Sequence, residues 1–485
     1  MKPLNYLWIC TDQQRFDTIG AHGNPYIKTP NLDRLVQEGV SFQRAYAQNP
    51  MCSPSRASFL TGRYPRSARA SINGNVTFSK DEILVTKTLA DAGYTCGLAG
   101  KLHLTSVHKR MEARTDDGYS FFKWCHHPFD SWPEGMNEYQ NWLKRQGIDW
   151  HAAYGSKFGD WPPPFPYHLP DEIQGIDPRY HQTTWCVEEA LNFMEASKDG
   201  PWCMSVNIFD PHPPFDPPQE YKDKLDPKDM PLPKYKDGEL DNKPASQRDC
   251  YYRGSANGML QPTTEMTDDD KRQVIRDYYA EIMLIDDQVG RLINYLEETG
   301  QRSNTVIIFM SDHGELLGDH GMYWKGGFLY DALLHVPLIF SCPGLIQQGV
   351  KSDALVELVD IAPTLLELSE LPASKVMQGK SFADILLGKK DPHYHKDCTY
   401  AEYYYSAGRL HQICATMYYD GRYKVIVHHN DELGELYDLQ EDPYEFDNLW
   451  NVAECADLRN SMVLKCFNHA IECNIDRVLG NTGMF

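Results

Sequence analysis

The sequence predicts an α/β fold in which a doubly wound, mostly parallel sheet is flanked by helices, and three observations support this. Short apolar runs recur along the chain and end in polar clusters, which is typical of strands buried on both faces. Amphipathic segments with a helical period lie between these runs. After Gly379 the pattern changes to alternating polar and apolar residues, which predicts a small C-terminal α+β subdomain.

The expected elements follow in chain order. Apolar runs predict core strands at residues 4–10, 94–98, 204–209 and 305–310. Amphipathic segments predict helices at residues 31–38, 84–92, 184–196 and 271–298. Two stretches rich in Pro, Trp, Tyr and Asp predict long irregular insertions over the sheet edge, where substrate selectivity usually resides: about residues 130–178 and 211–264.

We expect a catalytic domain over residues 1–389 and a C-terminal subdomain over residues 390–485. In the subdomain, residues 422–428 and 436–439 predict antiparallel strands and residues 458–473 predict a terminal helix. The tail from Asn474 onward is too short to fold alone, so packing on a second copy in a homo-oligomer is an open alternative.

Composition excludes several classes of protein. The 485 residues are 41% hydrophobic and 24% charged, which is ordinary for a globular chain and unlike a disordered, coiled-coil or collagen-like one. The net charge of 47 − 68 = −21 argues against a nucleic-acid or anionic-membrane partner, because phosphate attraction needs clustered Lys and Arg. Apolar runs stay well below the roughly 18 residues of a membrane span.

Thirteen cysteines with irregular spacing and no Cys-x-x-Cys pair argue against a secreted disulfide framework. The N-terminus runs straight into a strand and lacks the apolar core and cleavage site of a signal peptide. We therefore expect a cytoplasmic protein, with a trimmed leader and a periplasmic location as the alternative.

Polar residues follow the C-terminal ends of the expected strands, which is the edge where open α/β sheets bind ligands. Asp12 with Gln13, and Asp312 with His313, could converge there on one hard divalent cation. Their oxygen atoms suit Ca²⁺, Mg²⁺ or Mn²⁺, and the single imidazole is compatible with Mn²⁺ in particular. The alternative is that Asp12 caps a helix and the other pair ends a strand; taken jointly, the four residues favour the cation.

The segment from Cys52 to Arg63 is the most informative one. Ser53 suits a helix cap, Pro54 suits the first helical position and Gly62 suits the exit, which predicts a helix over residues 54–61. Cys52 would then precede a helix N-terminus, where N–H groups and the dipole favour an anion. Arg56 could bring a guanidinium to the same anion. A buried cysteine beside a structural arginine is the alternative.

Two phosphate-binding motifs fail on spacing. A tyrosine-phosphatase loop needs an arginine where Ser58 stands. A P-loop needs a glycine where Thr95 stands and a hydroxyl residue where Leu102 stands.

The motif Cys-x-Pro-Ser-Arg followed by Leu-Thr-Gly-Arg resembles the signature of the type I, formylglycine-dependent sulfatases of the alkaline-phosphatase superfamily. Further matches follow in the family's order along nearly the whole chain: Thr29-Pro30-Asn31-Leu32-Asp33-Arg34-Leu35, Gly100-Lys101-Leu102-His103, Pro211-His212-Pro213-Pro214-Phe215, Ser311-Asp312-His313-Gly314-Glu315, Leu436-Tyr437-Asp438-Leu439, Asp442-Pro443 and Asn448-Leu449. The resemblance implies an alkaline-phosphatase-like fold and a hydrolase that cleaves sulfate esters.

The resemblance also implies roles for single residues. Cys52 would be oxidised to formylglycine by a maturation enzyme, and one hydroxyl of its hydrated aldehyde would attack sulfur. Arg56 and the metal would hold that group. Lys101 and Lys325 would bind sulfate oxygens, where negative charge builds in the transition state.

His212 would donate a proton to the leaving oxygen, and His103 would take a proton from the second hydroxyl to expel sulfate. Each of these lysines and histidines has a plain alternative as a solvated or turn residue. The resemblance implies one divalent cation, Ca²⁺ ahead of Mn²⁺ or Mg²⁺, with these ligands: Asp12, Gln13, Asp312, His313 and the modified Cys52.

The residues Gln13 and His313 depart from many sulfatases and resemble the phosphonate monoester hydrolase and choline-sulfatase-like branch. A phosphonate monoester or phosphodiester hydrolase is therefore the main alternative. An inactive metal-binding or sulfated-glycan-binding protein and a cysteine-thiolate phosphatase are alternatives of other classes. The expected substrate is a small-molecule or carbohydrate sulfate ester, and tryptophans in the insertions could stack on it or serve as packing anchors: Trp124, Trp132, Trp142, Trp150 and Trp161.

Overall fold

The computed structural model describes residues 3–107, 112–127, 132–155, 167, 175–255, 260–407, 412–429, 431 and 433–474. Within these residues an eight-stranded sheet has the order β5-β4-β6-β1-β7-β8-β2-β9, and β8 alone runs antiparallel to its neighbours. Its strands are β1 Asn5–Thr11, β2 Gly39–Phe42, β4 Thr95–Gly100, β5 Phe121–Trp124, β6 Trp202–Asn207, β7 Thr305–Ser311, β8 Leu338–Ser341 and β9 Val350–Ser352. The predicted mostly parallel sheet is confirmed.

The four predicted core strands are β4, β6, β1 and β7, and they lie side by side in that order, all parallel. Their backbones are buried on both faces because each carries apolar side chains in both directions. In β1, Tyr6 and Trp8 point into the core on one face, and Leu7 and Ile9 point into the core on the other.

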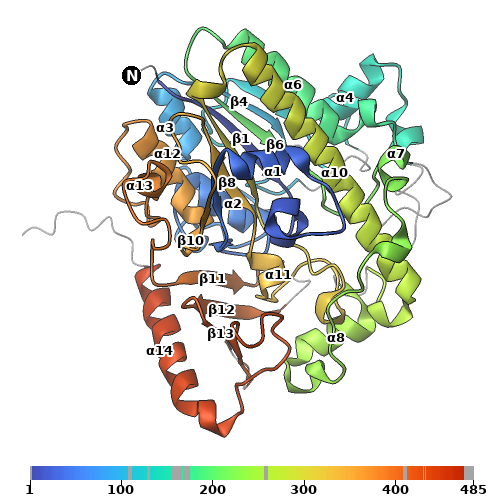
Figure 1. The fold of residues 1–485 in the computed structure, drawn as a ribbon, viewed down its shortest axis with the longest axis vertical. Helices are drawn as coiled ribbons and strands as arrows, with labels where there is room; N and C mark the ends of the chain where they lie inside the picture. Colours follow the sequence, from blue (N-terminus) through green and yellow to red (C-terminus); the bar gives the residue numbers. More distant parts are fainter. Residues whose placement is uncertain are drawn as a thin grey trace, which may run out of the picture.

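Helices cover both faces of the sheet (Figure 1). One face packs against α1, α6 and α10, and the other against α2, α3 and α12. The helices are α1 Pro30–Gln37, α2 Cys52–Thr61, α3 Val85–Asp91, α4 Glu138–Arg145, α6 Gln182–Ala196, α7 Gln219–Lys222, α8 Ala245–Arg253, α10 Asp268–Glu298, α11 Asp331–Leu334, α12 Ile361–Leu368, α13 Ala383–Leu386 and α14 Ala456–Glu472. The four predicted helices correspond to α1, α3, α6 and α10; the C-terminal ends of α6 and α10 coincide with the prediction, and the other ends are shifted by one to three residues.

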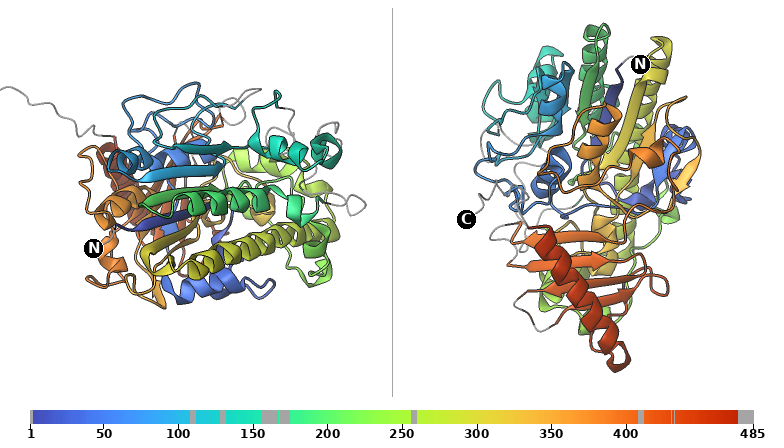
Figure 2. Two further views of the ribbon diagram at one scale, coloured as in Figure 1. Left: turned by 90° about the horizontal axis from the view of Figure 1, so that it is seen from above. Right: turned by 90° about the vertical axis from the view of Figure 1, so that its left-hand side faces the viewer.

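A second, antiparallel sheet lies at one end of the molecule, with α14 on its outer face (Figure 2). Its strands, in spatial order, are β11 Thr399–Tyr404, β12 Cys414–Tyr419, β13 Tyr423–His428 and β14 Glu435–Asp438. Met417 and Ile426 on its inner face join the core of the main sheet. Two short parallel strands, β3 Ala45–Tyr46 and β10 Val356–Glu357, form a separate two-stranded sheet. This sheet contacts the antiparallel sheet through β3 and β11.

The expectation of long irregular insertions is wrong in part. The first contains the helix α4, which Asn137 caps by accepting hydrogen bonds from two backbone N–H groups. The second contains α7 and α8. These helices are only four to nine residues long, so the sequence shows no sustained helical period for them among the many Pro and Trp residues.

Trp124 ends β5, and its ring packs edge to face on that of Trp132 with the centroids 5.2 Å apart, as a packing anchor does. Trp161 lies outside the described residues.

In the described part of the chain, no helix is both long enough and apolar enough to cross a membrane. All thirteen cysteines are free thiols.

Candidate active site

Polar residues from separate segments meet at the C-terminal edge of the central strands. Asp12 and Gln13 follow β1, Asp312 and His313 follow β7, and Lys101 follows β4. Because β4, β6, β1 and β7 are parallel neighbours, their ends lie together at one edge. The structure therefore brings together the five residues that the sequence pattern placed past strand ends.

The helix that carries Cys52 begins earlier than predicted. α2 starts at Cys52 itself, after the extended residue Met51, so Pro54 is the third helical residue and not the first. Proline is accepted there because the first N–H groups of a helix have no partner within it. The predicted Ser53 cap is wrong, since its hydroxyl accepts a hydrogen bond from the N–H of Gly74 at 2.9 Å. Cys52 still occupies the positive end of the helix dipole.

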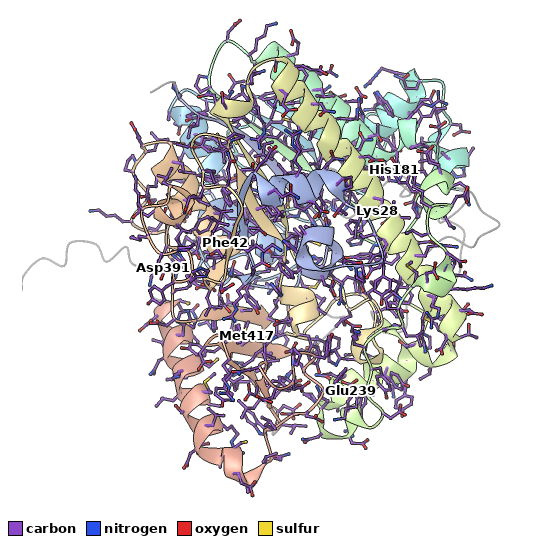
Figure 3. All side chains as sticks on the ribbon, in the orientation of Figure 1. Lys28, Phe42, His181, Glu239, Asp391 and Met417 are labelled. Atoms are coloured by element: carbon purple, nitrogen blue, oxygen red, sulfur yellow. The ribbon has the colours of Figure 1, made fainter. Side chains whose placement is uncertain are left out.

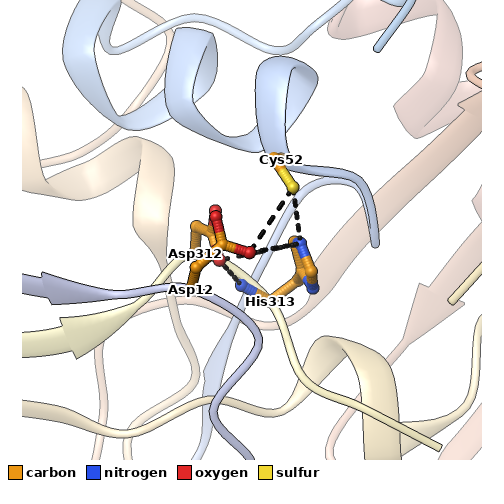
Figure 4. Close-up of side chains that lie close together, drawn as sticks. All are labelled: Asp12, Cys52, Asp312 and His313. Atoms are coloured by element: carbon orange, nitrogen blue, oxygen red, sulfur yellow. Dashed lines mark hydrogen bonds and ion pairs between the residues drawn. The ribbon is translucent and has the colours of Figure 1, made fainter. Parts of the chain in front are cut away.

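The Cys52 side chain lies at the centre of the cluster and is 1% exposed. Its Sγ is 3.3 Å from His313 Nε2 and 3.5 Å from Asp12 Oδ1, as the dashed lines in Figure 4 show. Two ammonium groups also lie close to this sulfur, Lys325 Nζ at 3.0 Å and Lys101 Nζ at 3.4 Å. Residue 52 thus contacts two of the expected metal ligands, Asp12 and His313, and both cationic side chains.

The charges around Cys52 stabilise an anion at its position. Burial and Asp12 raise the pKa of the thiol, whereas Lys101, Lys325 and His313 lower it, and the result is a pKa of about 5. A site that ionises a buried thiol at neutral pH also favours any group on which negative charge develops in a reaction.

Arg56 connects the parts of the cluster and is fully buried. Its Nε donates to Asp312 Oδ2 at 2.8 Å, and its Nη2 donates to Asp12 Oδ2 at 3.1 Å. Its Nη1 donates to the carbonyl oxygen of Lys101 at 2.8 Å. A planar guanidinium can make these three bonds at once, which fixes both carboxylates relative to β4.

The residues present fit a hard divalent cation. Ligand atoms of Asp12, Cys52, Asp312 and His313 all lie within 4.8 Å of one another. His313 Nδ1 donates to the carbonyl of Gly314 at 2.9 Å, so the Nε2 lone pair faces the carboxylates. Burial raises the pKa of Asp312 and the charge of Asp12 raises it further, which shows that the anionic form of this carboxylate is disfavoured here; a bound cation would stabilise that form.

Glu315 orients Gln13 and was not singled out as a site residue from the sequence. Gln13 has a left-handed backbone, with φ of 72°, and its amide Nε2 donates to Glu315. This leaves the amide Oε1 facing Lys325 Nζ, at 2.6 Å. Glu315 also accepts from the N–H of Leu317 at 2.9 Å and from the N–H of Trp324, and the second of these bonds ties the loop of Lys325 to the end of β7. Its place within the quoted Ser-Asp-His-Gly-Glu motif was the available signal.

His103 lies beside the cluster in a left-handed conformation, with φ of 59°. Its N–H donates to Glu112 Oε2 at 2.6 Å, and its ring packs edge to face on His126 at 4.6 Å. Burial lowers the pKa of His103 well below its usual value, and the charges of Lys101 and Arg56 add to this. A neutral imidazole of this kind can accept a proton.

His212 follows β6 on the loop that also contains Asp210. Its Nδ1 donates to the carbonyl of Pro213 at 2.7 Å, and its ring centroid lies 5.6 Å from that of His127. Burial lowers the pKa of His212 well below its usual value and Lys325 contributes. Since Nδ1 holds the proton of the neutral ring, Nε2 can donate only from the imidazolium form. Within the described residues, His212 and His103 do not hydrogen-bond Cys52.

A family model described as "Sulfatase" matches residues 4–371, which is more than half of the chain. The chain belongs to the sulfatase family. A second model, "N-sulphoglucosamine sulphohydrolase, C-terminal", matches residues 318–470 of this sulfatase. Family membership makes the protein a sulfuric ester hydrolase with an alkaline-phosphatase-like fold.

Relatives match this sulfatase over nearly its full length. An arylsulfatase of Clostridium perfringens is 29% identical, with 94% of this chain and 91% of the relative covered. A multifunctional alkaline phosphatase superfamily protein of Trinickia caryophylli is 30% identical, with 92% and 91% covered. The crystal structure of a phosphonate monoester hydrolase of Agrobacterium radiobacter has a TM-score of 0.83 and 26% identity, with 99% and 98% covered.

Proposed function

We propose that this sulfatase hydrolyses a sulfate monoester with an oxidised residue 52, formylglycine, as its nucleophile. The observation that carries the proposal is the placement of the Cys52 side chain. It contacts a carboxylate, an imidazole and two ammonium groups at the positive end of α2. A formylglycine there supplies a hydrated aldehyde, one hydroxyl of which attacks sulfur while the other allows sulfate to leave.

The residues that would hold the divalent cation are Asp12, Gln13, Asp312 and His313. Three of the four offer oxygen, which supports Ca²⁺ as the ion ahead of Mn²⁺ or Mg²⁺. A cation held there would supply positive charge for the ester oxygen and for the nucleophile. Arg56 keeps the two carboxylates oriented, because it bonds to both of them and to the backbone after β4.

Lys101 and Lys325 bind the sulfate group in this proposal. Both are buried, and each places its ammonium within 3.4 Å of Cys52 Sγ. The two preorganised ammonium groups would therefore stabilise the negative charge that builds on the sulfate oxygens in this buried site. Removal of one such donor costs roughly 100- to 1,000-fold in kcat in comparable sites.

The two histidines take the proton-transfer steps. His103 is neutral when buried beside Lys101, and this supports its role as the base that accepts a proton as sulfate leaves. His212 is neutral in the absence of substrate, so it becomes an acid only when the negative sulfate raises its pKa. Its donor atom is then Nε2, because Nδ1 is bonded to Pro213.

The acid role of His212 predicts a dependence on the leaving group. We expect His212→Ala to lower kcat for an alkyl or sugar sulfate by roughly 100- to 10,000-fold, because a poor leaving alkoxide needs the proton. The same variant is expected to lose far less activity on 4-nitrophenyl sulfate, whose phenolate leaves without protonation. Steady-state kinetics on both esters measures the difference, and equal losses on the two would exclude the acid role.

A phosphonate monoester hydrolase is the second candidate. The pair Gln13 and His313 favours it, as does the similarity to the Agrobacterium radiobacter enzyme. Rates on matched aryl sulfate and aryl phosphonate esters test the choice. We expect a higher kcat/KM for the sulfate ester, and a clear preference for the phosphonate would reject our proposal.

The expected partners follow from the same chemistry. We propose a small-molecule or carbohydrate sulfate ester as substrate and a formylglycine-generating enzyme as the maturation partner. A homo-oligomer remains the proposed alternative to a monomer. The thirteen free cysteines support a reducing compartment, the cytoplasm.

A further inference from the structure

The short turn after β1 carries the expected metal ligand Gln13, and contacts from other parts of the chain hold this turn. Gln13 has a left-handed backbone, which a residue with a side chain adopts only where its surroundings stabilise it. Its N–H donates to Asp312 Oδ1 at 3.1 Å. The next N–H, of Gln14, donates to the hydroxyl of Ser311 at 2.8 Å. The end of β7 thus holds the first half of the turn.

A tyrosine of α10 holds the second half of the turn. The hydroxyl of Tyr278 donates to the carbonyl oxygen of Gln13 at 2.8 Å and accepts the N–H of Arg15 at 2.9 Å. A hydroxyl can make both bonds, since it carries one hydrogen and has lone pairs. Burial raises the pKa of Tyr278 well above its usual value, so the hydroxyl keeps the proton that it donates. Tyr278 therefore bridges the two ends of the turn.

The fold fixes the position of Tyr278 itself. The residue is fully buried and lies on α10, a helix of 31 residues whose side chains Figure 3 shows. Its ring packs edge to face on that of Phe215, with the centroids 5.2 Å apart. Phe215 belongs to the segment that also contains His212. Tyr278 thus contacts both the turn of Gln13 and the segment that carries the expected proton donor.

We propose that Tyr278 is a positioning residue for the divalent cation, because its hydroxyl keeps Gln13 in the left-handed conformation that presents the amide oxygen to the site. This role rests on the cation proposed above at the ends of β1 and β7. Glu315 holds the amide of Gln13 and Tyr278 holds its backbone, so the two contacts together set the direction of the side chain. Loss of a residue that orients a ligand without touching the metal typically costs about 10- to 100-fold in metal affinity.

Tyr278→Phe tests the proposal on the full-length protein, because it removes only the hydroxyl and keeps the ring contact with Phe215. The protein is freed of metal with a chelator and titrated with Mn²⁺, and free Mn²⁺ is followed by electron paramagnetic resonance. We expect the dissociation constant for Mn²⁺ to rise at least about 10-fold. An unchanged constant would overturn the proposal.

Tyr6→Phe is the matched control for this titration. Tyr6 is a buried tyrosine at the other end of β1, and its hydroxyl lies 2.7 Å from that of Ser369. The control also removes one hydroxyl from a packed ring, but it leaves the turn of Gln13 intact. It should therefore keep the wild-type dissociation constant, and a rise equal to that of Tyr278→Phe would show a general effect of such a change and reject the proposal.

A double-variant cycle shows whether Tyr278 acts through Gln13. Gln13→Ala removes the amide that Tyr278 is proposed to orient, while the other ligands of the cluster remain. Tyr278→Phe should therefore weaken Mn²⁺ binding far less in the Gln13→Ala background than in the wild type. An equal loss in both backgrounds would mean that Tyr278 acts by another route and would overturn the proposal.

Amide hydrogen exchange gives a readout that does not depend on the cation. The N–H of Arg15 loses its acceptor in Tyr278→Phe, so peptides that contain Arg15 should exchange faster in this metal-free variant than in the wild type or in Tyr6→Phe. If the wild type binds Mn²⁺ but exchange is unchanged in Tyr278→Phe, the role of Tyr278 alone is rejected. If the wild type binds no Mn²⁺, the cation is rejected and this role with it.

Discussion

Cys52→Ser is expected to transfer one sulfate group to residue 52 and then stop. A serine hydroxyl at this position keeps the contacts of Lys101 and Lys325 with the sulfate, so attack on sulfur remains possible. It lacks the second hydroxyl that expels sulfate from a hydrated aldehyde. Steady-state turnover should fall on the order of 10⁴-fold or more, while a single rapid release of alcohol remains.

Mass spectrometry of the peptide that contains residue 52 measures this outcome. The stalled Cys52→Ser protein should carry one sulfate group, whereas Cys52→Ala, the control, should carry none and release no burst of alcohol. The matured wild-type peptide should be about 18 Da lighter than the cysteine form, because an aldehyde oxygen replaces the thiol. Normal turnover by Cys52→Ser would contradict the elimination step.

Arg56→Lys is expected to damage both stability and activity. A lysine ammonium cannot donate at once to Asp12, Asp312 and the Lys101 carbonyl, so at least one buried acceptor loses its partner. Breaking a buried ion pair costs on the order of 3 kcal/mol of unfolding free energy. We expect kcat to fall at least about 100-fold as well, because the carboxylates that orient the site lose their common donor.

The matched control is Arg302→Lys, a buried arginine outside the site that bonds to Ser341 and Glu38. Chemical denaturation and kcat/KM are measured for both variants. The Arg302 variant should lose stability but keep wild-type kcat. An Arg56→Lys protein with full activity would show that the guanidinium geometry does not matter for the reaction.

The sequence was sufficient to predict the strands that build the site. Within the predicted strands, residues 6–10 and 306–310 are uninterrupted apolar runs because β1 and β7 are covered on both faces, and that pattern requires no knowledge of the rest of the fold. The polar residues after them, Asp12 and Asp312, could be placed at one edge for the same reason. Lys325 was different: it lies on a loop, and only the resemblance to a family pointed to it.

Long-range contacts set the limits of prediction. The start of α2 was misplaced by two residues because Ser53 bonds to Gly74, a contact made by chain folding and not by local capping. The support of Gln13 by Glu315 and of His103 by Glu112 depends on left-handed turns at Gln13 and His103. Non-glycine residues seldom adopt that conformation, so local residue preferences do not predict it.

Burial of Cys52 sets an order of events for the oxidation that we propose at this residue. In the folded protein its side chain is 1% exposed and enclosed by β-strand ends that are about 40 to 260 residues away in sequence. An oxidising enzyme can therefore reach the thiol only while this part of the chain is still open. If the chain folds before Cys52 is oxidised, the cysteine stays buried and unmodified, and the folded protein is inactive.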